Sequence, residues 1–150
     1  MLIVQTDAYI FDRFKIYDFI IKDYNFIGAP VIISNYLDCF KFFNRGIYYN
    51  GGLSLRKIQF CIDCLNDINF INKYKEYNSC ADEDLIFSSY EQCFYNSPDY
   101  IESLKFSIDN QMHLYLPVIN LEQPFGIHHF WNNDDNGYNK LEILEKMKWI

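Results

Sequence analysis

Short apolar runs alternate with polar stretches along the first third of the chain. The first run, LIVQTD at residues 2–7, is rich in β-branched residues and ends in polar ones, which favours a buried strand. Residues 24–33, YNFIGAPVII, predict a second extended segment that is interrupted by Gly28 and Pro30. The first third of the chain is therefore expected to contain β-strands.

The apolar spacing then changes to a helical period. Residues 57–71 predict one helix, and Ile58, Cys61, Leu65 and Ile68 are expected to form its buried stripe. A polar loop is expected at residues 72–81. A second helix follows at residues 82–94, with acidic residues in its first turn, where the helix dipole favours them. Further expected segments are short extended runs at 105–109 and 114–119 and a terminal helix at 140–150.

No internal repeat and no clear domain boundary interrupt this pattern. We expect a single domain over residues 1–150, in which residues 132–150 form a loop and a terminal helix. The loop is indicated by NNDDNG, a run of turn-forming residues at 132–137.

Composition excludes several classes of protein. The 150 residues are 50% hydrophobic and 19% aromatic, which argues against disorder. A net charge of −7 is a poor match for nucleic acid or an anionic membrane, because phosphate contacts need a basic face. No signal peptide is visible, and no apolar run approaches the roughly 20 residues of a transmembrane helix. We expect no nucleic-acid partner and no transmembrane segment.

Cysteine use points to a reducing compartment. The chain has five cysteines, an odd number without a secretory signal, so we expect reduced thiols and a cytoplasmic protein. Cys61 and Cys64 form a C-x-x-C motif. A redox or zinc site would need a second ligand pair or a thioredoxin-like context, and neither is visible. Core packing is therefore the preferred interpretation.

The stretch NGGLSLRK, residues 50–57, contains two adjacent glycines in a chain that is otherwise rich in large side chains. Glycine has no β-carbon and permits positive φ, so Gly51 and Gly52 indicate either a tight turn or a close approach of the backbone to another group.

Five stretches taken in order carry a family resemblance: QTD (5–7), NGGLSLR (50–56), EDLIFS (83–88), KFSID (105–109) and PFGIHHFW (124–131). Together they resemble a domain-of-unknown-function family that is similar to glycosyltransferases of the GT-A type and, more loosely, to the β-1,4-galactosyltransferases. The resemblance implies a partial GT-A-like α/β fold (a nucleotide-diphospho-sugar transferase fold) with a small mixed sheet. That sheet should contain the strand at residues 2–6 and a strand around 53–55.

The resemblance also implies a divalent metal, manganese or magnesium, on the diphosphate of a nucleotide-sugar donor. Asp7 matches the last acid of the metal-binding motif, while Gln5 replaces its first acid. His128 matches the histidine that completes such sites, and His129 is the competing choice. Hard cations prefer oxygen ligands, so a second carboxylate would fit better than Gln5.

For catalysis, the resemblance assigns Glu83 and Asp84 to the acidic motif of inverting enzymes. Asp84 would deprotonate the acceptor hydroxyl and Glu83 would orient it or bind the acceptor. The alternative is that both acids only occupy the first turn of a helix. Arg56 is expected to pair with a carboxylate or with the diphosphate, and a structural salt bridge is the alternative.

Donor and acceptor contacts are implied for the remaining motif residues. Gly51 and Gly52 would lie under the sugars, and Asn50 would contact their hydroxyls. Trp131 would stack on a sugar ring, as would Tyr49 and Phe125, for each of which core packing is the alternative.

The acidic motif stands close to Met1, whereas a GT-A domain carries its nucleotide-binding half before that motif. We therefore expect an N-terminally truncated domain that lacks this half: a truncated reading frame, a fragment, or a chain that a separate polypeptide completes as its partner. Two functions follow. One is inverting transfer of a sugar from a nucleotide-sugar to a hydroxyl of a glycan or other acceptor. The alternative is a non-catalytic remnant or glycan-binding module without donor binding.

Overall fold

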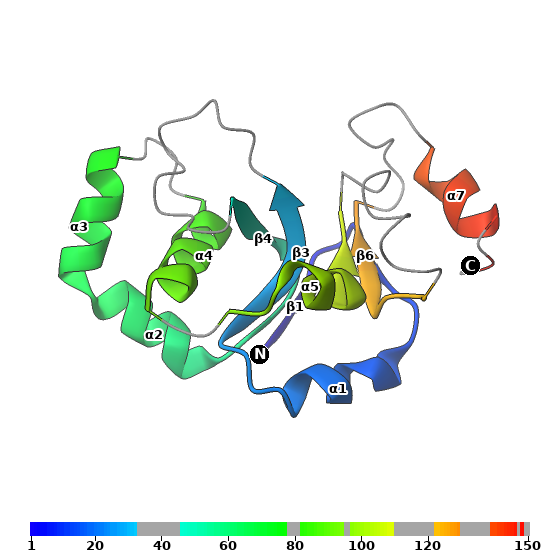
Figure 1. Ribbon diagram of the computed structural model, residues 1–150, viewed down its shortest axis with the longest axis horizontal. Helices are drawn as coiled ribbons and strands as arrows, with labels where there is room; N and C mark the ends of the chain where they lie inside the picture. The colour runs from blue at the N-terminus through cyan, green and yellow to red at the C-terminus, as the bar shows by residue number, and fades with distance from the viewer. Residues whose placement is uncertain are drawn as a thin grey trace.

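The computed structural model contains two three-stranded sheets with helices packed around them (Figure 1). It describes residues 1–32, 46–77, 82–94, 97–109, 122–129, 139–146 and 148. The strands are β1 (Leu2–Val4), β2 (Ala8–Ile10), β3 (Phe26–Ile32), β4 (Ile47–Arg56), β5 (Ser107–Ile108) and β6 (Gly126–His128). The helices are η1 (Arg13–Lys15), α1 (Ile16–Ile20), α2 (Ile58–Asn66), α3 (Ile68–Tyr77), α4 (Glu83–Phe94), α5 (Tyr100–Phe106) and α7 (Lys140–Lys146). The expected mixed α/β class is confirmed.

The first sheet has the order β1-β4-β3, and its strands are antiparallel. Leu2 lies opposite Leu55, so the two strands that the sequence predicted to share a sheet are direct neighbours. The burial expected for the first strand is wrong, because β1 is an edge strand and Leu2 and Val4 are exposed. The second sheet has the order β2-β6-β5, in which β2 is antiparallel and β5 parallel to β6.

One face of the first sheet is covered by α4, against which α2 packs, and α3 packs on α2 (Figure 1). The side chains of Phe26 and Tyr49 point to this face, and their rings meet edge to face at 5.8 Å. Tyr49 is fully buried, and its hydroxyl donates a hydrogen bond to the carbonyl of Pro98 at 2.6 Å. The rest of this core comes from the helices and β4: Ile47, Phe60, Cys64, Phe70, Tyr74, Phe87 and Tyr90.

The opposite face of the first sheet packs on α1, α5 and the second sheet. Ile27 and Leu53 supply the side chains from β3 and β4, and Phe19 comes from α1. Phe106 and Phe125 stack on one another at 5.1 Å between ring centroids. The phenyl ring of Phe125 is fully buried, so the core alternative holds for Phe125 as for Tyr49.

The helix expected at residues 57–71 is two helices. Asp67 separates them, because its side chain accepts a hydrogen bond from the Phe70 amide (2.9 Å) at the start of α3. The expected buried stripe is wrong for three of its four members: Ile58, Leu65 and Ile68 are exposed. Phe60 and Cys64 are buried instead, with Cys61 packed beside them, so the C-x-x-C motif belongs to the core.

Two further boundaries differ from the sequence prediction. Residues 72–77, expected in a loop, continue α3, and residues 105–106, expected to be extended, end α5. The helix expected at 82–94 is α4, and α7 falls within the predicted terminal range. The extended run expected at 114–119 and the loop expected at 132–137 lie outside the described residues.

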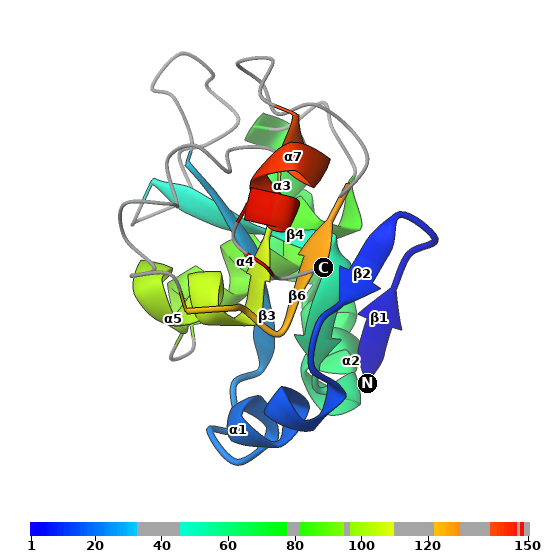
Figure 2. The same cartoon turned by 90° about the vertical axis from the view of Figure 1, so that its right-hand side faces the viewer.

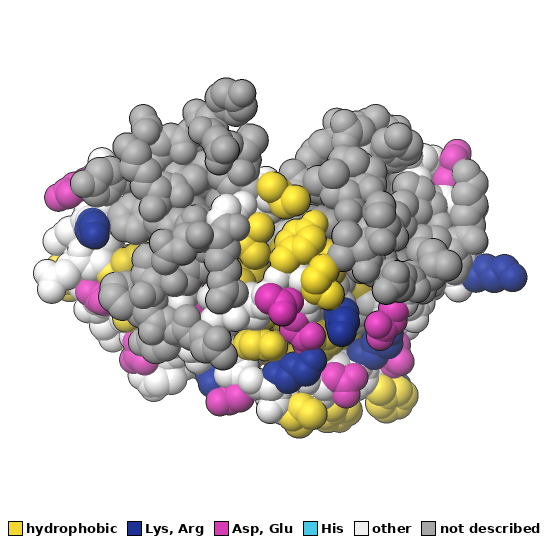
Figure 3. Space-filling model, viewed as in Figure 1, with side chains coloured by type: hydrophobic (Ala, Val, Ile, Leu, Met, Phe, Trp, Pro, Cys, Tyr) yellow, Lys and Arg dark blue, Asp and Glu magenta, His cyan; other side chains and the backbone are white. Residues whose placement is uncertain are grey.

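Charged side chains of both signs lie over α5 and its surroundings on the face shown in Figure 3. Hydrophobic side chains protrude at the lower edge of that view, where Figure 1 places α1. Phe14, Tyr17, Ile20 and Ile21 are the exposed hydrophobic residues of this segment.

The connection from β1 to β2 joins the two sheets. The chain leaves the first sheet after Val4, turns, and enters the second sheet at Ala8 (Figure 2). Inside this turn, the amide of Ala8 donates to the Gln5 carbonyl at 3.0 Å, and the amide of Gln5 donates to the Gly52 carbonyl at 2.8 Å. Asp7 is therefore held at the junction of the sheets, close to the bulged part of β4.

Candidate functional site

The glycine pair lies in a bulge of β4. Gly28 of β3 pairs with Ser54, whereas the next residue, Ala29, pairs with Asn50. Residues 51–53 are thus extra residues on β4, opposite a single step of β3. The Asn50 side-chain oxygen accepts a hydrogen bond from the Gly52 amide at 2.8 Å, which holds the bulge in shape. The side-chain oxygen of Asn50 is therefore hydrogen-bonded to the backbone of the bulge.

Gly52 lies directly against the imidazole of His128. A β-carbon built on Gly52 would be 2.1 Å from Nε2 and 2.3 Å from Cε1 of that ring. No side chain fits in that space. The close approach of backbone to another group, one of the two alternatives for the glycine pair, is therefore what the structure shows at Gly52.

Gly51 faces the other way, toward the start of α4. Its amide donates to Oδ2 of Asp84 at 3.2 Å, and Oδ1 of Asp84 accepts from the Leu85 amide at 2.8 Å. Burial raises the pKa of the Asp84 carboxyl, and the two backbone donors lower it in part. A carboxylate with a raised pKa is a better proton acceptor near neutral pH than an ordinary one.

Arg56 is engaged beneath the bulge. Its Nε donates to the Ser54 hydroxyl at 2.9 Å, and its Nη2 lies 3.1 Å from Oε1 of Glu83. The guanidinium also lies over the rings of Phe26 (4.8 Å) and Phe87 (5.3 Å). The arginine side chain is only 5% exposed, whereas that of Glu83 is 58% exposed. These contacts explain Arg56 as a structural group that pairs with Glu83, and its role in donor or acceptor binding stays a prediction.

Two histidines and two carboxylates meet on the other side of the glycine pair. The rings of His128 and His129 lie 3.7 Å apart between centroids. Their Nε2 atoms approach the two oxygens of Asp7, at 3.1 Å for His128 and 2.7 Å for His129. Their Nδ1 atoms approach one oxygen of Asp109, at 3.5 Å and 3.3 Å. The two imidazoles are therefore bracketed by acids at both edges.

Backbone geometry explains why these groups meet. His128 ends β6, and Asp109 follows β5, which runs parallel to β6 with Ile108 beside Ile127. Successive residues of a strand normally point to opposite faces. His129 has φ 51°, a left-handed conformation, and the chain turns there so that both rings lie together.

Asp7, His128 and His129 form a set of donors suited to a metal ion. One ligand atom from each lies within 4.8 Å of the others, and Oε1 of Gln5 is 3.0 Å from Nε2 of His128. The set offers two imidazole nitrogens and one carboxylate. Mg²⁺ strongly prefers oxygen ligands, whereas first-row transition cations accept imidazole. These residues therefore fit a transition cation better than magnesium.

The structure brings most of the predicted site residues around the glycine pair. Asp84 and Glu83 lie on the Gly51 side, and His128 and Asp7 lie on the Gly52 side. Trp131 lies outside the described residues. Sequence reasoning gave no role to Asp109, although KFSID was among the motif stretches; the usable signal was an acid at the end of a short apolar strand.

Comparisons with known proteins give one match. The searches of curated proteins and of solved structures found none. No helix in the described part of the chain is long and apolar enough to cross a membrane. A family model described as "Protein of unknown function (DUF5672)" matches residues 1–128, a span that includes Asp7, the glycine pair, Asp84, Asp109 and His128. The chain therefore belongs to the DUF5672 family.

Proposed function

We propose that the protein takes part in glycosyl transfer, moving a sugar from a nucleotide-sugar donor to a hydroxyl acceptor with inversion at the anomeric carbon. One observation carries the proposal. The adjacent glycines of the β4 bulge touch the half-buried carboxylate of Asp84 on one side and the imidazole of His128 on the other. Gly51 and Gly52 are themselves buried, so we propose that the sugar binds at the exposed edge of this junction, with its diphosphate held by the cation.

Asp7, His128 and His129 would hold the cation. A divalent ion bound there would supply positive charge to the diphosphate leaving group. Because two of the three donors are imidazoles, we propose manganese rather than magnesium. The side chain of Asp7 is 19% exposed and that of His129 is 30% exposed, so this edge of the set is open to solvent and to a donor.

Asp84 would act as the general base. The acceptor hydroxyl gives its proton to the Asp84 carboxylate while its oxygen bonds to the anomeric carbon, and the bond from that carbon to the diphosphate breaks with its electron pair on the leaving oxygen. Burial already raises the pKa of Asp84 in the right direction. Glu83 would keep the start of α4 in place through Arg56.

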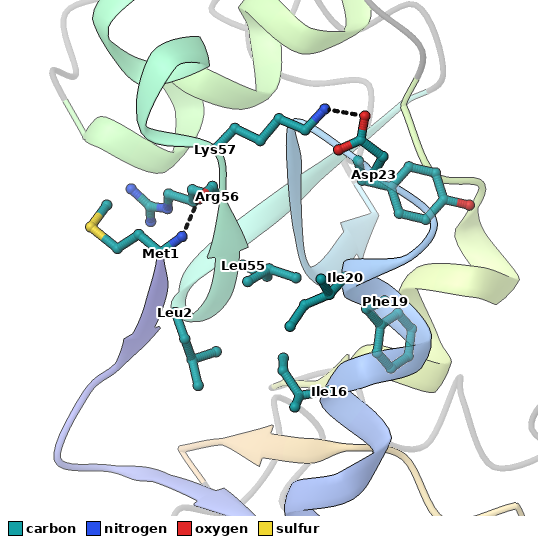
Figure 4. A pocket seen from close by; sticks show the side chains of 10 residues that line it. Met1, Leu2, Ile16, Phe19, Ile20, Asp23, Leu55, Arg56 and Lys57 are labelled. Atoms are coloured by element: carbon teal, nitrogen blue, oxygen red, sulfur yellow. Dashed lines mark hydrogen bonds and ion pairs between the residues drawn. The ribbon is translucent and has the colours of Figure 1, made fainter.

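The proposal includes a partner that contributes to donor binding at the open edge of the first sheet. β1 is an edge strand there, with Leu2 39% and Val4 47% exposed. Beside it opens a pocket of about 380 Å³, into which Ile16, Ile20 and Leu55 point (Figure 4). An exposed strand edge with apolar side chains favours addition of another strand. Arg56 is the one predicted site residue among those that line the pocket.

The second candidate, a glycan-binding module without donor binding, would bind a sugar at the same exposed edge without chemistry. Turnover separates the two functions, since a binding module retains the acceptor and produces no free nucleotide.

The test is a donor-hydrolysis and transfer assay with a panel of UDP- and GDP-sugars and Mn²⁺. It uses the protein isolated from its native source, with any polypeptide that stays bound to it. Asp84→Asn should lower turnover by roughly 10²–10⁴-fold, the usual contribution of a general base. Donor binding should change little. Asp82→Asn is the matched control, because Asp82 is an exposed acid two residues before Asp84. Equal loss in both variants, or no turnover with any donor, contradicts the proposal.

A further inference from the structure

The outer edge of β1 has backbone groups that can pair with a further strand. Met1 and Arg56 exchange two backbone hydrogen bonds, of 2.6 Å and 2.8 Å. In an antiparallel pair, residues that bond to the neighbouring strand alternate with residues whose amide and carbonyl point the other way. Leu2 and Val4 therefore direct their amides and carbonyls away from β4, and β4 is the one strand beside β1 in the described part of the chain.

Helix α2 carries an exposed apolar strip in addition to its core face. Phe60 and Cys64 face the core, whereas Ile58, Ile62 and Leu65 recur at helical spacing and are 59%, 45% and 55% exposed. The exposed polar residues lie on a third side of the helix: Gln59, Asp63 and Asn66. A helix with a single packing contact is polar over the rest of its surface. The pattern of α2 is that of a helix with two packing contacts.

The apolar strip of α2 lies on the side of the helix toward β1. Helical spacing places Cys61 between Cys64 of the core face and Leu65 of the strip. Burial raises the pKa of the Cys61 thiol, and the positive charges of Arg56 and of the Met1 ammonium lower it in part, so this side of the helix is near Met1. Figures 1 and 2 both show the N-terminus beside the start of α2.

The opposite face of the sheet has an apolar surface at the same edge. Leu2 lines the pocket of about 380 Å³ together with Ile16 and Ile20 of α1 (Figure 4). Ile20 is half exposed there. The open edge of β1 is therefore flanked by apolar helix surfaces on both faces of the sheet, the strip of α2 on one and the pocket beside α1 on the other.

We infer that a β-strand of the partner, apolar on both faces, adds to β1 and lies between the α2 strip and the α1 pocket. This inference rests on the partner contained in the proposed function, and it does not depend on the metal or on Asp84. The partner strand would exchange backbone hydrogen bonds with Leu2 and Val4. Its alternate side chains would enter the pocket and contact the strip. Strands that are buried on both faces are near-continuous runs of Val, Ile and Leu, which is the sequence expected of the partner strand.

The exposed area is sufficient for a stable contact. The large apolar residues of this surface are each about half exposed: Met1, Leu2, Val4, Ile20, Ile58, Ile62 and Leu65. Together they expose on the order of 600 Å², close to the roughly 800 Å² that each partner of a stable interface buries and at the upper end of what a monomer exposes.

Charge favours a different chain over a second copy of this one. The net charge of −7 makes two copies repel each other. At the β1 edge itself, the Met1 ammonium and Lys57 are positive, and Lys57 is paired with Asp23 at 2.8 Å. A partner that is less acidic than this chain meets no such repulsion.

The first measurement is the affinity of the partner for single variants of the chain. Wild type and variants are made in the native host and purified with any polypeptide that stays bound, and light scattering gives the mass of each assembly. Val4→Lys changes the strand edge, Ile62→Asp the strip, and Ile20→Asp the pocket. Each should weaken partner binding by about tenfold or more, because a charge would be buried in an apolar contact.

The matched control is Gln59→Asp, which adds a charge on the polar side of α2 and should bind the partner as wild type does. All four positions are exposed, so the chain itself should keep its fold, which far-UV circular dichroism checks.

The second measurement is hydrogen exchange of the native assembly and of the chain freed from its partner. The amides of Leu2 and Val4 should exchange about tenfold or more slowly in the assembly, because strand pairing gives them acceptors. The amides of β6, which already has a strand on each side, should exchange equally in both and serve as the reference.

Two kinds of result overturn the inference. A native protein with the mass of one chain, or of two copies of this chain, removes the partner strand. Unchanged exchange at Leu2 and Val4, or a folded Ile62→Asp variant that binds the partner as wild type does, shows that the partner does not lie between the two helix surfaces. A partner strand bound as inferred to a protein without glycosyl transfer leaves the inference standing and removes the proposed function.

Discussion

The backbone of Gly52 and the imidazole of His128 are packed so closely that a β-carbon on Gly52 would lie 2.1 Å from Nε2. The neighbouring Gly51 has its own close contacts, since a β-carbon there would lie 2.4 Å from Nη2 of Arg56 and 2.7 Å from Oε1 of Glu83. The two glycines thus separate two groups of polar residues that come from different parts of the chain.

Alanine substitution at each glycine should separate the two groups by their effects. Both Gly51→Ala and Gly52→Ala should lower the free energy of unfolding by about 1–3 kcal/mol, the usual cost of forcing an extra carbon into a packed region. Only Gly52→Ala displaces His128, so only this variant should also lose Mn²⁺ affinity, which calorimetry measures. Equal metal affinities in the two variants would separate the bulge from the cation site.

Arg56→Lys tests whether the arginine serves the fold or the donor. The planar guanidinium donates to Ser54, pairs with Glu83 and stacks on two rings, and a lysine cannot reproduce this geometry. We expect a loss of about 2 kcal/mol in the free energy of unfolding, measured in urea, with little change in Mn²⁺ affinity. Arg13→Lys, at an exposed position, is the control. An unchanged stability together with a raised KM for the donor would favour the donor-binding role.

The Glu91 carboxyl should make the free energy of unfolding depend on pH. Burial raises the pKa of its carboxyl to about 8, although Asn25 and Lys57 lower it in part. In the unfolded chain the carboxyl ionises near pH 4.5, so the folded state binds the proton more tightly. The contribution of protonated Glu91 to the free energy of unfolding is fully present below pH 4.5, falls as the pH rises, and is lost above pH 8.

Between pH 5 and pH 8 this effect amounts to roughly 3 kcal/mol, since one unit of pKa corresponds to about 1.36 kcal/mol. Glu91→Gln should therefore flatten the pH dependence of unfolding over that interval, as followed by urea titration. Glu76→Gln, at an exposed position of α3, should leave it as in wild type. A Glu91→Gln protein with the same pH dependence as wild type would show that Glu91 does not hold the proton.

Local sequence signals predicted the parts of the fold that depend on local geometry. The β-branched run before Asp7 predicted β1, and the close backbone approach in β4 is one of the two alternatives that the glycine pair left open. The proximity of Asp7 and His128, implied by the family resemblance, is a contact of 3.1 Å in the structure. Whether these residues bind a metal stays a prediction.

Features that depend on distant pairing or on a single dihedral angle could not be predicted. Asp109 reaches the histidines because β5 pairs in parallel with β6, and His129 joins them because of its positive φ. Neither the parallel pairing nor the positive φ can be predicted from the sequence pattern. The stripe chosen for α2 was wrong because apolar residues occur on most sides of that helix, and the periodicity alone does not distinguish the face with Phe60 and Cys64 from the face with Ile58 and Leu65.

Electron–nuclear double resonance of Mn²⁺ bound to the native protein shows whether Asp7, His128 and His129 hold a cation that also binds the diphosphate of a sugar nucleotide. We expect nitrogen couplings from two imidazoles, a ³¹P coupling that arises when a UDP- or GDP-sugar of the panel is added, and loss of the bound Mn²⁺ signal in Asp7→Asn. Histidine-bound Mn²⁺ that shows no ³¹P coupling with any saturating donor, or an Asp7→Asn protein that binds Mn²⁺ as wild type does, would contradict it.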